Sequence, residues 1–380
     1  MRQFQSRLII ELLVILQLLE NTMSKYWSAR THELDPYTAG EQPQDQQYIK
    51  LNTNENPYPP SPLAIAAMQQ ASGEAMRLYS DPNAKQLKQS IASFYEVETN
   101  QVFVGNSSDE VLAHAFAGIL KHDKPLLFPD ISYSFYPVYC KLFGIKSTLV
   151  PLAGDFTIHV DDYLNADENG AIVFPNPNAP TGIALTLSEI ETILKANPES
   201  PVLIDEAYVD FGADTAIALI NQYPNLLVVQ TFSKARSLAG LRVGFAVGHA
   251  DLIEALERVK NSFNAYPLDR AAIAGGSAAM DDKTYFEASC AKIIKTREQT
   301  AKSLSKLGFD VLPSKANFVF AKPNQSKLGK TAEQLYQELK TAGVLVRYFN
   351  KPRISEYLRI TIGTDAEMEH FFDKLAEITS

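Results

Sequence analysis

The chain has 380 residues, of which 46% are hydrophobic and 21% are charged, a composition typical of a globular protein long enough for two domains. Its formal net charge of −9 argues against nucleic acid or an anionic membrane as the partner, but not against a small phosphorylated ligand. The six histidines show no close pair at metal-ligand spacing, so no metal site is predicted. Two distant cysteines, Cys140 and Cys290, form no disulfide framework and favour the reducing cytoplasm.

The N-terminal residues 1–22 differ from the rest of the chain. Residues 8–19 form an apolar run that is too short to span a bilayer, which needs about 20 residues. A signal peptide fits in form, but Glu11 interrupts the run and no small-residue cleavage site follows. Because Met23 begins a sequence typical of a protein start, we interpret residues 1–22 as a non-native extension, or as a disordered or interface helix.

Residues 23–62 are polar and rich in proline, which predicts an extended N-terminal arm that packs on the C-terminal domain. Between residues 63 and 275, short apolar runs alternate with helical patterns. Strands are predicted over residues 102–104, 125–128, 147–151, 171–174, 202–204, 226–230 and 243–247, and helices over residues 85–95, 111–120, 133–143 and from 188 onward. This alternation predicts a large α/β domain with a mostly parallel sheet covered by helices on both faces.

Polar side chains follow these strands at several points. They are Ser108, Asp109, Tyr133, Asn178, Asp205, Tyr208 and Lys234. Because the carboxyl ends of parallel strands meet at one edge of a sheet, we expect these groups to lie together around a ligand. Loops always contain polar residues, however, so chance placement is the alternative for each residue taken alone.

The segment over residues 105–110 opens a predicted helix. Its free backbone N–H groups and the positive end of the helix dipole would suit a phosphate, and Ser108 would add a hydroxyl. An ordinary helix N-cap is the alternative. Farther along, Asp205 could pair with a protonated pyridine nitrogen, with a helix cap, a salt bridge or a metal site beside Glu206 as alternatives. Tyr208 could bond a ring oxygen, or it could simply pack.

A lysine lies in the polar loop between two predicted strands, over residues 231–242. Lys234 follows the first strand, and Arg242 directly precedes the second. An amine held in a cleft could form a Schiff base with a carbonyl cofactor and then move a proton, while the arginine could bind a cofactor phosphate. Tyr133 could stack on the cofactor ring. A solvated surface loop is the alternative, since most lysines are exposed.

The C-terminal part, residues 276–380, has a different pattern. Helices are predicted over residues 291–307 and 331–342, and strands over 318–321, 344–346 and 358–362. This mixture predicts a smaller α+β domain. Arg347 and Arg359 belong to strand-like apolar runs, where a charge needs a partner. A substrate with two anionic groups, such as a carboxylate and a phosphate, would supply partners, and a buried Asp or Glu is the alternative.

Five short motifs occur in this chain in a fixed order. They are Ser108-Asp109-Glu110, Asn178-Ala179-Pro180-Thr181-Gly182, Asp205-Glu206-Ala207-Tyr208, Ser233-Lys234-Ala235 and Gly240-Leu241-Arg242. Together they resemble the class II subfamily of the fold-type I pyridoxal-phosphate aminotransferases, and most closely the histidinol-phosphate aminotransferases, over about residues 30–375. The resemblance implies pyridoxal 5'-phosphate as the cofactor. It also implies amino-group transfer between L-histidinol phosphate and 2-oxoglutarate, in histidine biosynthesis.

The resemblance also implies roles for individual residues. Lys234 would be the Schiff-base lysine, Asp205 the partner of the pyridine nitrogen and Tyr208 the contact of the ring oxygen, which makes these three the candidate catalytic residues. The other candidate cofactor-binding residues are Ser108, Asp109, Tyr133, Asn178, Ser233, Arg242 and Tyr79. Tyr79 would reach the cofactor of the neighbouring subunit, which implies a homodimer with a shared active site. The candidate substrate-binding residues are Tyr37, Asn54, Arg347 and Arg359.

Two positions depart from the family pattern. Ala179 stands where many relatives have a second asparagine on the ring oxygen, so either Asn178 takes over or Tyr208 makes that contact alone. Ser107 replaces a glycine, which tightens the turn but leaves the amides available. An aromatic-amino-acid aminotransferase and a threonine-phosphate decarboxylase are the nearest alternative functions. A non-catalytic protein that binds pyridoxal phosphate or another phosphate is the alternative from a different class.

Overall fold

A seven-stranded sheet forms the centre of the large domain in the computed structural model, which describes residues 24–38, 40–165 and 169–379. The strand order is β2-β8-β7-β6-β5-β3-β4. The strands are β2 (Val102–Asn106), β3 (Leu126–Pro129), β4 (Ser147–Val150), β5 (Ala171–Pro175), β6 (Val202–Asp205), β7 (Leu226–Thr231) and β8 (Val243–Gly248). β8 is antiparallel to both of its neighbours, while the other adjacent pairs are parallel. The predicted mostly parallel sheet is therefore confirmed, with one reversed strand that the sequence pattern did not indicate.

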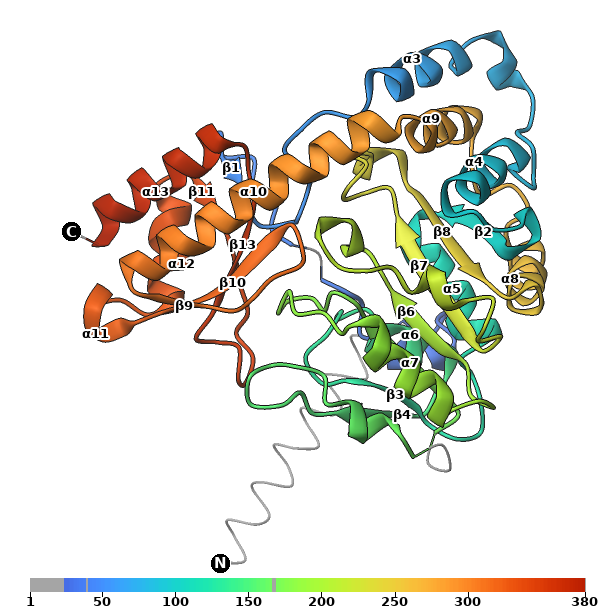
Figure 1. The fold of residues 1–380 in the computed structure, drawn as a ribbon, viewed down its shortest axis with the longest axis horizontal. Coiled ribbons are helices and arrows are strands. Elements are labelled where there is room, and N and C mark those ends of the chain that lie inside the picture. The colour runs from blue at the N-terminus through green and yellow to red at the C-terminus, as the bar shows by residue number, and fades with distance from the viewer. Residues whose placement is uncertain (1–23, 39, 166–168, 380) are drawn as a thin grey trace, which may run out of the picture.

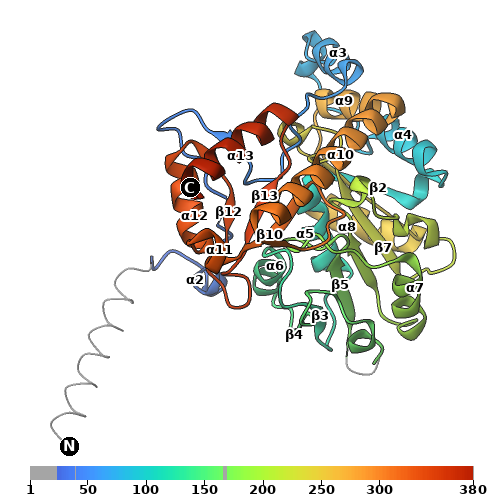
Figure 2. The same cartoon turned by 60° about the vertical axis from the view of Figure 1, so that its left-hand side comes forward.

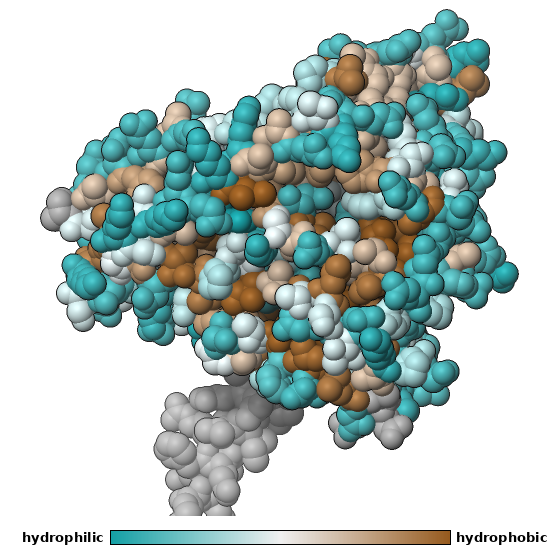
Figure 3. All heavy atoms as spheres, viewed as in Figure 1, coloured by the Kyte–Doolittle hydropathy of each residue, from teal (hydrophilic) through white to brown (hydrophobic). Residues whose placement is uncertain are grey.

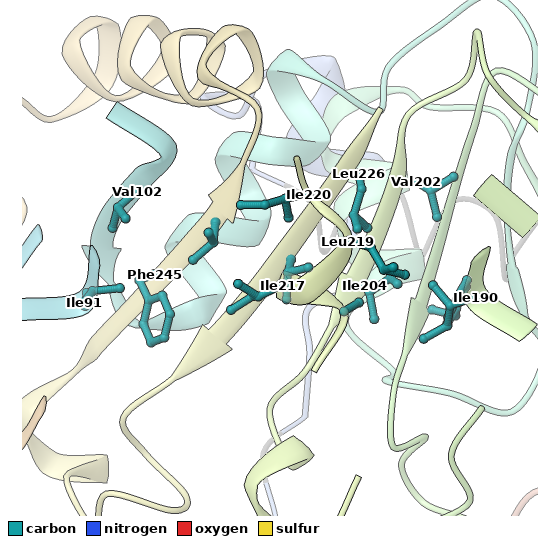
Figure 4. Close-up of a cluster of buried hydrophobic side chains, with 14 of the residues drawn as sticks. Ile91, Val102, Ile190, Val202, Ile204, Ile217, Leu219, Ile220, Leu226 and Phe245 are labelled. Atoms are coloured by element: carbon teal, nitrogen blue, oxygen red, sulfur yellow. The ribbon is translucent and has the colours of Figure 1, made fainter. Parts of the chain in front are cut away.

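Helices cover both faces of this sheet (Figure 1). Alternate residues of each strand point to opposite faces, so Val228 of β7 packs in one hydrophobic cluster and Val229 in the other. The first face is covered by α4 (Lys85–Tyr95), α7 (Leu187–Ala196) and α9 (Arg270–Asp281), and the second by α5 (Ser107–Gly118), α6 (Tyr136–Phe143) and α8 (Ala250–Phe263). Figure 4 shows part of the first cluster, in which Ile91 of α4 and Ile190 of α7 lie beside strand residues.

The small domain follows a long helix, α10 (Lys283–Leu307), which runs out from the end of α9 (Figure 1). Its sheet has the antiparallel order β12-β13-β10-β9. The strands of the small domain are β9 (Phe309–Val311), β10 (Phe318–Pro323), β11 (Val344–Leu345), β12 (Arg347–Tyr348) and β13 (Leu358–Thr361). The helices that follow α10 are α11 (Gln325–Leu328), α12 (Ala332–Thr341) and α13 (Asp365–Thr379). Figure 2 shows this α+β unit as a lobe beside the large domain, which confirms the predicted fold class.

The N-terminal segment joins the small domain through a short parallel pair between β1 (Ile49–Lys50) and β11. Helix α2 (Ala29–Glu33) precedes it, and α3 (Pro62–Ala71) packs on α9. The predicted extension over residues 1–22 lies outside the described residues. The predicted boundary between residues 275 and 276 falls inside α9, and the division into an arm and two domains stays a prediction.

Short 3-10 helices complete the described chain. They are η1 (Glu74–Arg77), η2 (Thr99–Gln101), η3 (Val160–Tyr163), η5 (Val209–Phe211), η6 (Ala216–Leu219) and η7 (Ala239–Leu241). On the face drawn in Figure 3, hydrophobic side chains gather along the middle of the molecule, whereas the rim is mostly hydrophilic. Within the described ranges, no helix is both long enough and apolar enough to cross a membrane.

Candidate active site

The candidate site lies where the carboxyl ends of β6 and β7 approach the start of α5. Asp205 is the last residue of β6, Lys234 follows the end of β7, and Ser108 lies in the first turn of α5. Parallel pairing brings such strand ends to one edge of the sheet, as the sequence pattern predicts. Hydrogen bonds join Asp109 to Tyr133 and Arg242, and Asn54 to Tyr208, while the roles assigned to the predicted residues stay predictions.

Asp109 organises the corner that is predicted to bind a phosphate. Its Oδ2 accepts hydrogen bonds from Arg242 Nη2 at 2.9 Å and from Ser107 Oγ at 2.8 Å. Its Oδ1 accepts a hydrogen bond from Tyr133 Oη at 2.9 Å, and its backbone carbonyl accepts one from Tyr139 Oη at 2.8 Å. Asp109 thus holds one edge of the Arg242 guanidinium, and about half of the Arg242 side chain stays exposed to receive an anion.

The first turn of α5 has backbone N–H groups that a phosphate could bind. Its N-cap, Asn106, makes no side-chain capping bond, and Ser108 Oγ has no hydrogen-bond partner among the described residues. Ser107 adopts a left-handed backbone with φ of +71°, which costs a non-glycine residue about 1 kcal/mol. Gly244 permits this geometry, because a Cβ there would lie 2.2 Å from the Ser108 backbone nitrogen. The turn is thus tight, as the Ser107 departure predicts.

Asp205 is a buried carboxylate at the edge of this corner, with 5% of its surface exposed. Its Oδ2 accepts a hydrogen bond from Tyr136 Oη at 3.0 Å, and its Oδ1 accepts one from the Ala207 backbone N–H at 3.2 Å. Burial raises the pKa of Asp205 to about 6, against the opposing effect of these two hydrogen bonds. A cationic ring nitrogen beside this carboxylate would offset the cost of burying its charge.

Lys234 presents a primary amine without an anionic partner. Its Nζ donates a hydrogen bond to the Thr53 backbone carbonyl at 3.1 Å and lies 5.8 Å from the ring centroid of Tyr208. No carboxylate within the described ranges lies at ion-pair distance from this amine. The side chain is only partly buried, so the amine is held in place by one neutral acceptor and remains open to a carbonyl carbon.

The position of Ala179 is filled by apolar packing. Ala179 lies in a small hydrophobic cluster that the Tyr208 ring packs against. Both hydrogens of the Asn178 side-chain amide are engaged, because Nδ2 donates to Ile131 O at 3.0 Å and to Thr181 Oγ1 at 3.1 Å. This arrangement favours the second alternative from the sequence, in which Tyr208 alone contacts the ring oxygen.

Two arginines face each other on neighbouring strands of the small domain. Arg347 of β12 and Arg359 of β13 are direct partners in the antiparallel ladder. Arg359 Nη2 donates to the Asn52 carbonyl at 2.9 Å, while its Nε is buried without a hydrogen-bond partner. Burial lowers the pKa of Arg359, and the neighbouring charge of Arg347 contributes to the same shift. Neither arginine pairs with a carboxylate among the described residues, so the pair is suited to bind an anion.

The other predicted substrate residues lie on the N-terminal segment. Asn54 Nδ2 donates to Tyr208 Oη at 2.9 Å, which places it in the site. Tyr37 stacks on Phe135 with ring centroids 4.7 Å apart, beside the loop that carries the predicted ring-stacking tyrosine.

Ser233, a predicted cofactor-binding residue, lies in the lysine loop. It is almost fully buried, and its Oγ accepts a hydrogen bond from the hydroxyl of Thr231 at 3.0 Å.

Tyr79 does not join the site within one chain. It is 79% exposed and stacks on Tyr266 with ring centroids 4.7 Å apart. Arg270 Nη2 donates to its backbone carbonyl at 2.7 Å, so the loop around Tyr79 is anchored to α9. An exposed, pre-oriented pair of tyrosine rings is suited to contact another protein surface.

Sequence reasoning missed several residues that hold the site together. Tyr136, which donates to Asp205, carries a recognisable signal because it follows Tyr133 by three residues at the start of a helix. Arg353, at the tip of the β12–β13 hairpin, pairs with Asp130 at 3.2 Å and donates to two nearby carbonyls, which ties the hairpin to the large domain. Asn56, which contacts the backbone of the lysine loop, carries no local signal.

The geometry fits pyridoxal phosphate. A cradle of amides and a half-exposed arginine suit its phosphate, a buried carboxylate at a strand end suits its ring nitrogen, and an unpaired amine suits its aldehyde. A doubly covered, mostly parallel sheet with these groups defines an enzyme of the fold-type I pyridoxal-phosphate class. Residues 46–375 match the model of the family "Aminotransferase class I and II", and the chain belongs to this family. The family that the motifs resemble is thereby confirmed.

Known relatives support the same assignment. The chain is 58% identical over 353 residues to "Histidinol-phosphate aminotransferase 1" of Pseudomonas aeruginosa, covering 93% of this chain and 99% of the relative. It is 60% identical to "Histidinol-phosphate aminotransferase" of a Marinomonas species, covering 91% and 97%. A solved histidinol-phosphate aminotransferase from Sinorhizobium meliloti in complex with pyridoxal-5'-phosphate has a TM-score of 0.84 at 23% identity, covering 94% and 98%, and shows the shared fold.

Proposed function

We propose that this aminotransferase uses pyridoxal phosphate to move an amino group between L-histidinol phosphate and 2-oxoglutarate, as a step of histidine biosynthesis. The observation that carries the proposal is the pair Arg347 and Arg359, two cations on adjacent strands without a carboxylate partner among the described residues. An anionic group of the substrate would satisfy both. The relatives named for this reaction, with at least 97% of their length covered, support the same choice.

The residues have distinct roles in this proposal. Pyridoxal phosphate, when bound, supplies an aldehyde that bonds to amines and a ring that accepts electrons. Lys234 would hold the cofactor through its amine and would then move a proton at the substrate carbon. Asp205 keeps a proton on the ring nitrogen, while Tyr208 donates its hydroxyl hydrogen to the ring oxygen. Arg242 and the first turn of α5 would hold the phosphate.

The two substrates differ in their anionic groups. Histidinol phosphate has a phosphate and no carboxylate, whereas glutamate has two carboxylates. The reaction would run in two halves, with the substrates entering in turn, so one anion site must accept both chemistries. A planar guanidinium binds carboxylate and phosphate oxygens in the same fork geometry, and two of them on facing strands suit both substrates.

The enzyme is also proposed to act as a homodimer in the cytoplasm. The exposed stacked rings of Tyr79 and Tyr266 support a subunit interface, and exposed apolar residues accompany them on the same chain segments. These are Met76, Leu78 and Phe263. Both cysteines are free and buried, which agrees with a reducing compartment. Sedimentation of the purified enzyme is expected to show a dimer.

The function is tested by comparing amino donors with purified enzyme and 2-oxoglutarate. The kcat/KM for L-histidinol phosphate is expected to exceed that for phenylalanine by at least about 100-fold, because the two arginines would meet a phosphate of about −1.5 to −2 charge in the first donor and a carboxylate of a single charge in the second. Faster turnover of phenylalanine would instead establish an aromatic-amino-acid aminotransferase. A protein that binds the cofactor but transfers no amino group from any donor would be a binding protein.

Replacing Arg359 with methionine is expected to separate activity from stability. The kcat/KM for 2-oxoglutarate should fall by about 100-fold or more, since a buried charge pair with the substrate is lost. The melting temperature should stay the same or rise, because an incompletely satisfied guanidinium is replaced by an apolar side chain. Arg258→Met is the control, because Arg258 is exposed and its one ion pair with a described residue is the surface pair with Glu254. An active but destabilised Arg359→Met enzyme would assign Arg359 a structural role.

A further inference from the structure

One short segment of the N-terminal arm touches three of the proposed functional groups. The carbonyl of Asn52 accepts a hydrogen bond from Arg359, and the carbonyl of Thr53 accepts one from Lys234. The Asn54 amide donates to Tyr208. These contacts join residues that are between 154 and 307 positions apart in the sequence. The segment over residues 52–56 is called the arm segment here.

Asn56 connects the arm segment to the backbone of the lysine loop. Its Nδ2 donates to the carbonyls of Lys234 at 3.1 Å and Ala235 at 3.2 Å. Its Oδ1 accepts a hydrogen bond from the Tyr58 backbone N–H at 3.0 Å, which forms a turn that fixes the side chain. One amide therefore binds two consecutive backbone carbonyls, those of Lys234 and Ala235.

The arm segment is itself firmly held by the small domain. Asn54 has a left-handed backbone with φ of +57°, and its N–H donates to Thr361 Oγ1 at 3.0 Å. The Asn317 amide donates to the Asn54 carbonyl at 3.0 Å, and the Thr361 N–H donates to the Leu51 carbonyl at 2.9 Å. The lysine loop is thus attached, through Asn56, to the same sheet that carries the two substrate-binding arginines.

The position of the Lys234 backbone matters because the amine lies at the end of a long, flexible side chain. Four rotatable bonds separate Nζ from Cα, so a rigid Cα position reduces the number of orientations that the amine must search. The Thr53 carbonyl then gives the amine a fixed acceptor at 3.1 Å whenever it is not bonded to carbon. Asn56 thus restrains the Lys234 backbone and Thr53 restrains its amine. Both residues belong to the arm segment and not to the sheet of the large domain.

We propose that Asn56 is a positioning residue for Lys234, and that it holds the lysine loop so that the free amine rests on the Thr53 carbonyl. The proposal rests on the proposed role of Lys234 in cofactor binding. Asn56 touches neither cofactor nor substrate in this account and acts only through the lysine backbone. Loss of its Nδ2 donor should therefore change the behaviour of the Lys234 amine even in enzyme freed of its cofactor.

The test compares Asn56→Ser and Asn56→Ala in full-length, cofactor-free enzyme. A serine hydroxyl can still accept from the Tyr58 N–H, but it is too short to reach the carbonyls of Lys234 and Ala235. Asn56→Ser therefore keeps the turn and loses the two hydrogen bonds to the lysine loop. Reductive methylation of Lys234, followed by mass spectrometry and normalised to exposed Lys295, is expected to proceed between about two- and tenfold faster in both variants, the range of one net hydrogen bond. Asn264→Ser is the matched control.

Asn264 suits this purpose because its Oδ1 also accepts from a tyrosine N–H two residues later, that of Tyr266, and within the described ranges no hydrogen bond joins it to the lysine loop. An unchanged Lys234 rate in both Asn56 variants would overturn the proposal. A faster rate in Asn56→Ala alone would also overturn it, because the turn rather than the donor would then matter. With cofactor added, the pH midpoint of its visible absorbance should shift in both variants. Absence of that absorbance in the unmodified enzyme would refute the proposed function, while the methylation rates would still test Asn56.

Discussion

Lys234→Ala enzyme is expected to lose transamination almost completely, with kcat lowered by about 10,000-fold for either substrate pair. Two contributions disappear together, because the same amine attaches the cofactor and moves the proton. The fold should survive, since the Lys234 amine makes a single hydrogen bond, to the Thr53 carbonyl, and pairs with no carboxylate in the described part of the chain. The loss of stability should stay near about 1 kcal/mol.

The cofactor should still bind to this variant, although more weakly. Arg242, its partner Asp109 and the first turn of α5 are untouched, so the phosphate keeps its cradle. Equilibrium dialysis of bound pyridoxal phosphate measures the affinity, and single-turnover kinetics with each amine measures the chemical step. Lys295→Ala is the control, because Lys295 is exposed on α10. A Lys234→Ala enzyme within tenfold of normal activity would show that another amine performs the reaction.

Three positions that the sequence singled out share one property. Asp205 ends β6, Lys234 lies three residues beyond the end of β7, and α5 begins directly after β2, so the local pattern indicates both the strand and its end. Parallel pairing of β6 with β7 then brings Asp205 and Lys234 to one edge of the sheet, and β2 ends at the same edge because it is antiparallel to β8, which is itself antiparallel to β7. The sequence also indicated Arg347 and Arg359, because a charged residue is unusual within a strand-like apolar run and needs a partner there. Their direct pairing across the ladder was not visible, because register depends on the hairpin between them.

The residues that escaped prediction act over long sequence separations. Asn56 contacts the lysine loop across 178 positions, and Arg353 reaches the large domain across about 200. Neither residue type nor spacing marks such a contact, because a surface asparagine or arginine has the same local pattern. The reversed direction of β8 also escaped, since a fully buried strand reads the same in both orientations. Local patterns thus identified reacting groups, whereas tertiary packing alone identifies the groups that hold them in place.

Asp205→Asn is expected to lower kcat/KM by between about 100- and 1,000-fold, because the carboxylate that would keep the ring nitrogen protonated becomes a neutral amide. The side chain keeps its shape: its amide oxygen can still accept from the Ala207 N–H, and its NH2 can donate to the Tyr136 hydroxyl, which then acts as the acceptor. Glu206→Gln is the matched control. Glu206 is also buried, but its carboxylate accepts hydrogen bonds from Thr215, Gln230 and Ala216 on the other side of the strand end. Loss of the Glu206 charge should therefore lower kcat/KM by less than about tenfold.

The same pair of variants should separate in stability as the pH changes. The pKa of Asp205 is raised to about 6 by burial, against about 3.9 in an unfolded chain, so the folded, cofactor-free protein holds a proton that the unfolded chain releases. This protonation contributes on the order of 3 kcal/mol to the free energy of unfolding. The contribution is complete below about pH 4 and is lost as the pH rises through 6. The pKa of Glu206, raised to about 7 by burial, gives a similar loss that ends near pH 7.

Urea unfolding of the cofactor-free enzyme between pH 4 and pH 8 measures this dependence. Asp205→Asn should remove the part of the loss that ends near pH 6, and Glu206→Gln the part that ends near pH 7, because each amide no longer titrates. Cofactor affinity at pH 8 should fall in Asp205→Asn but not in Glu206→Gln. The reason is that a cationic ring nitrogen would stabilise the charged carboxylate of Asp205 and not that of Glu206. If cofactor binding protects both variants equally at pH 8, the ring nitrogen does not lie against Asp205, and the proposed orientation of the cofactor is wrong.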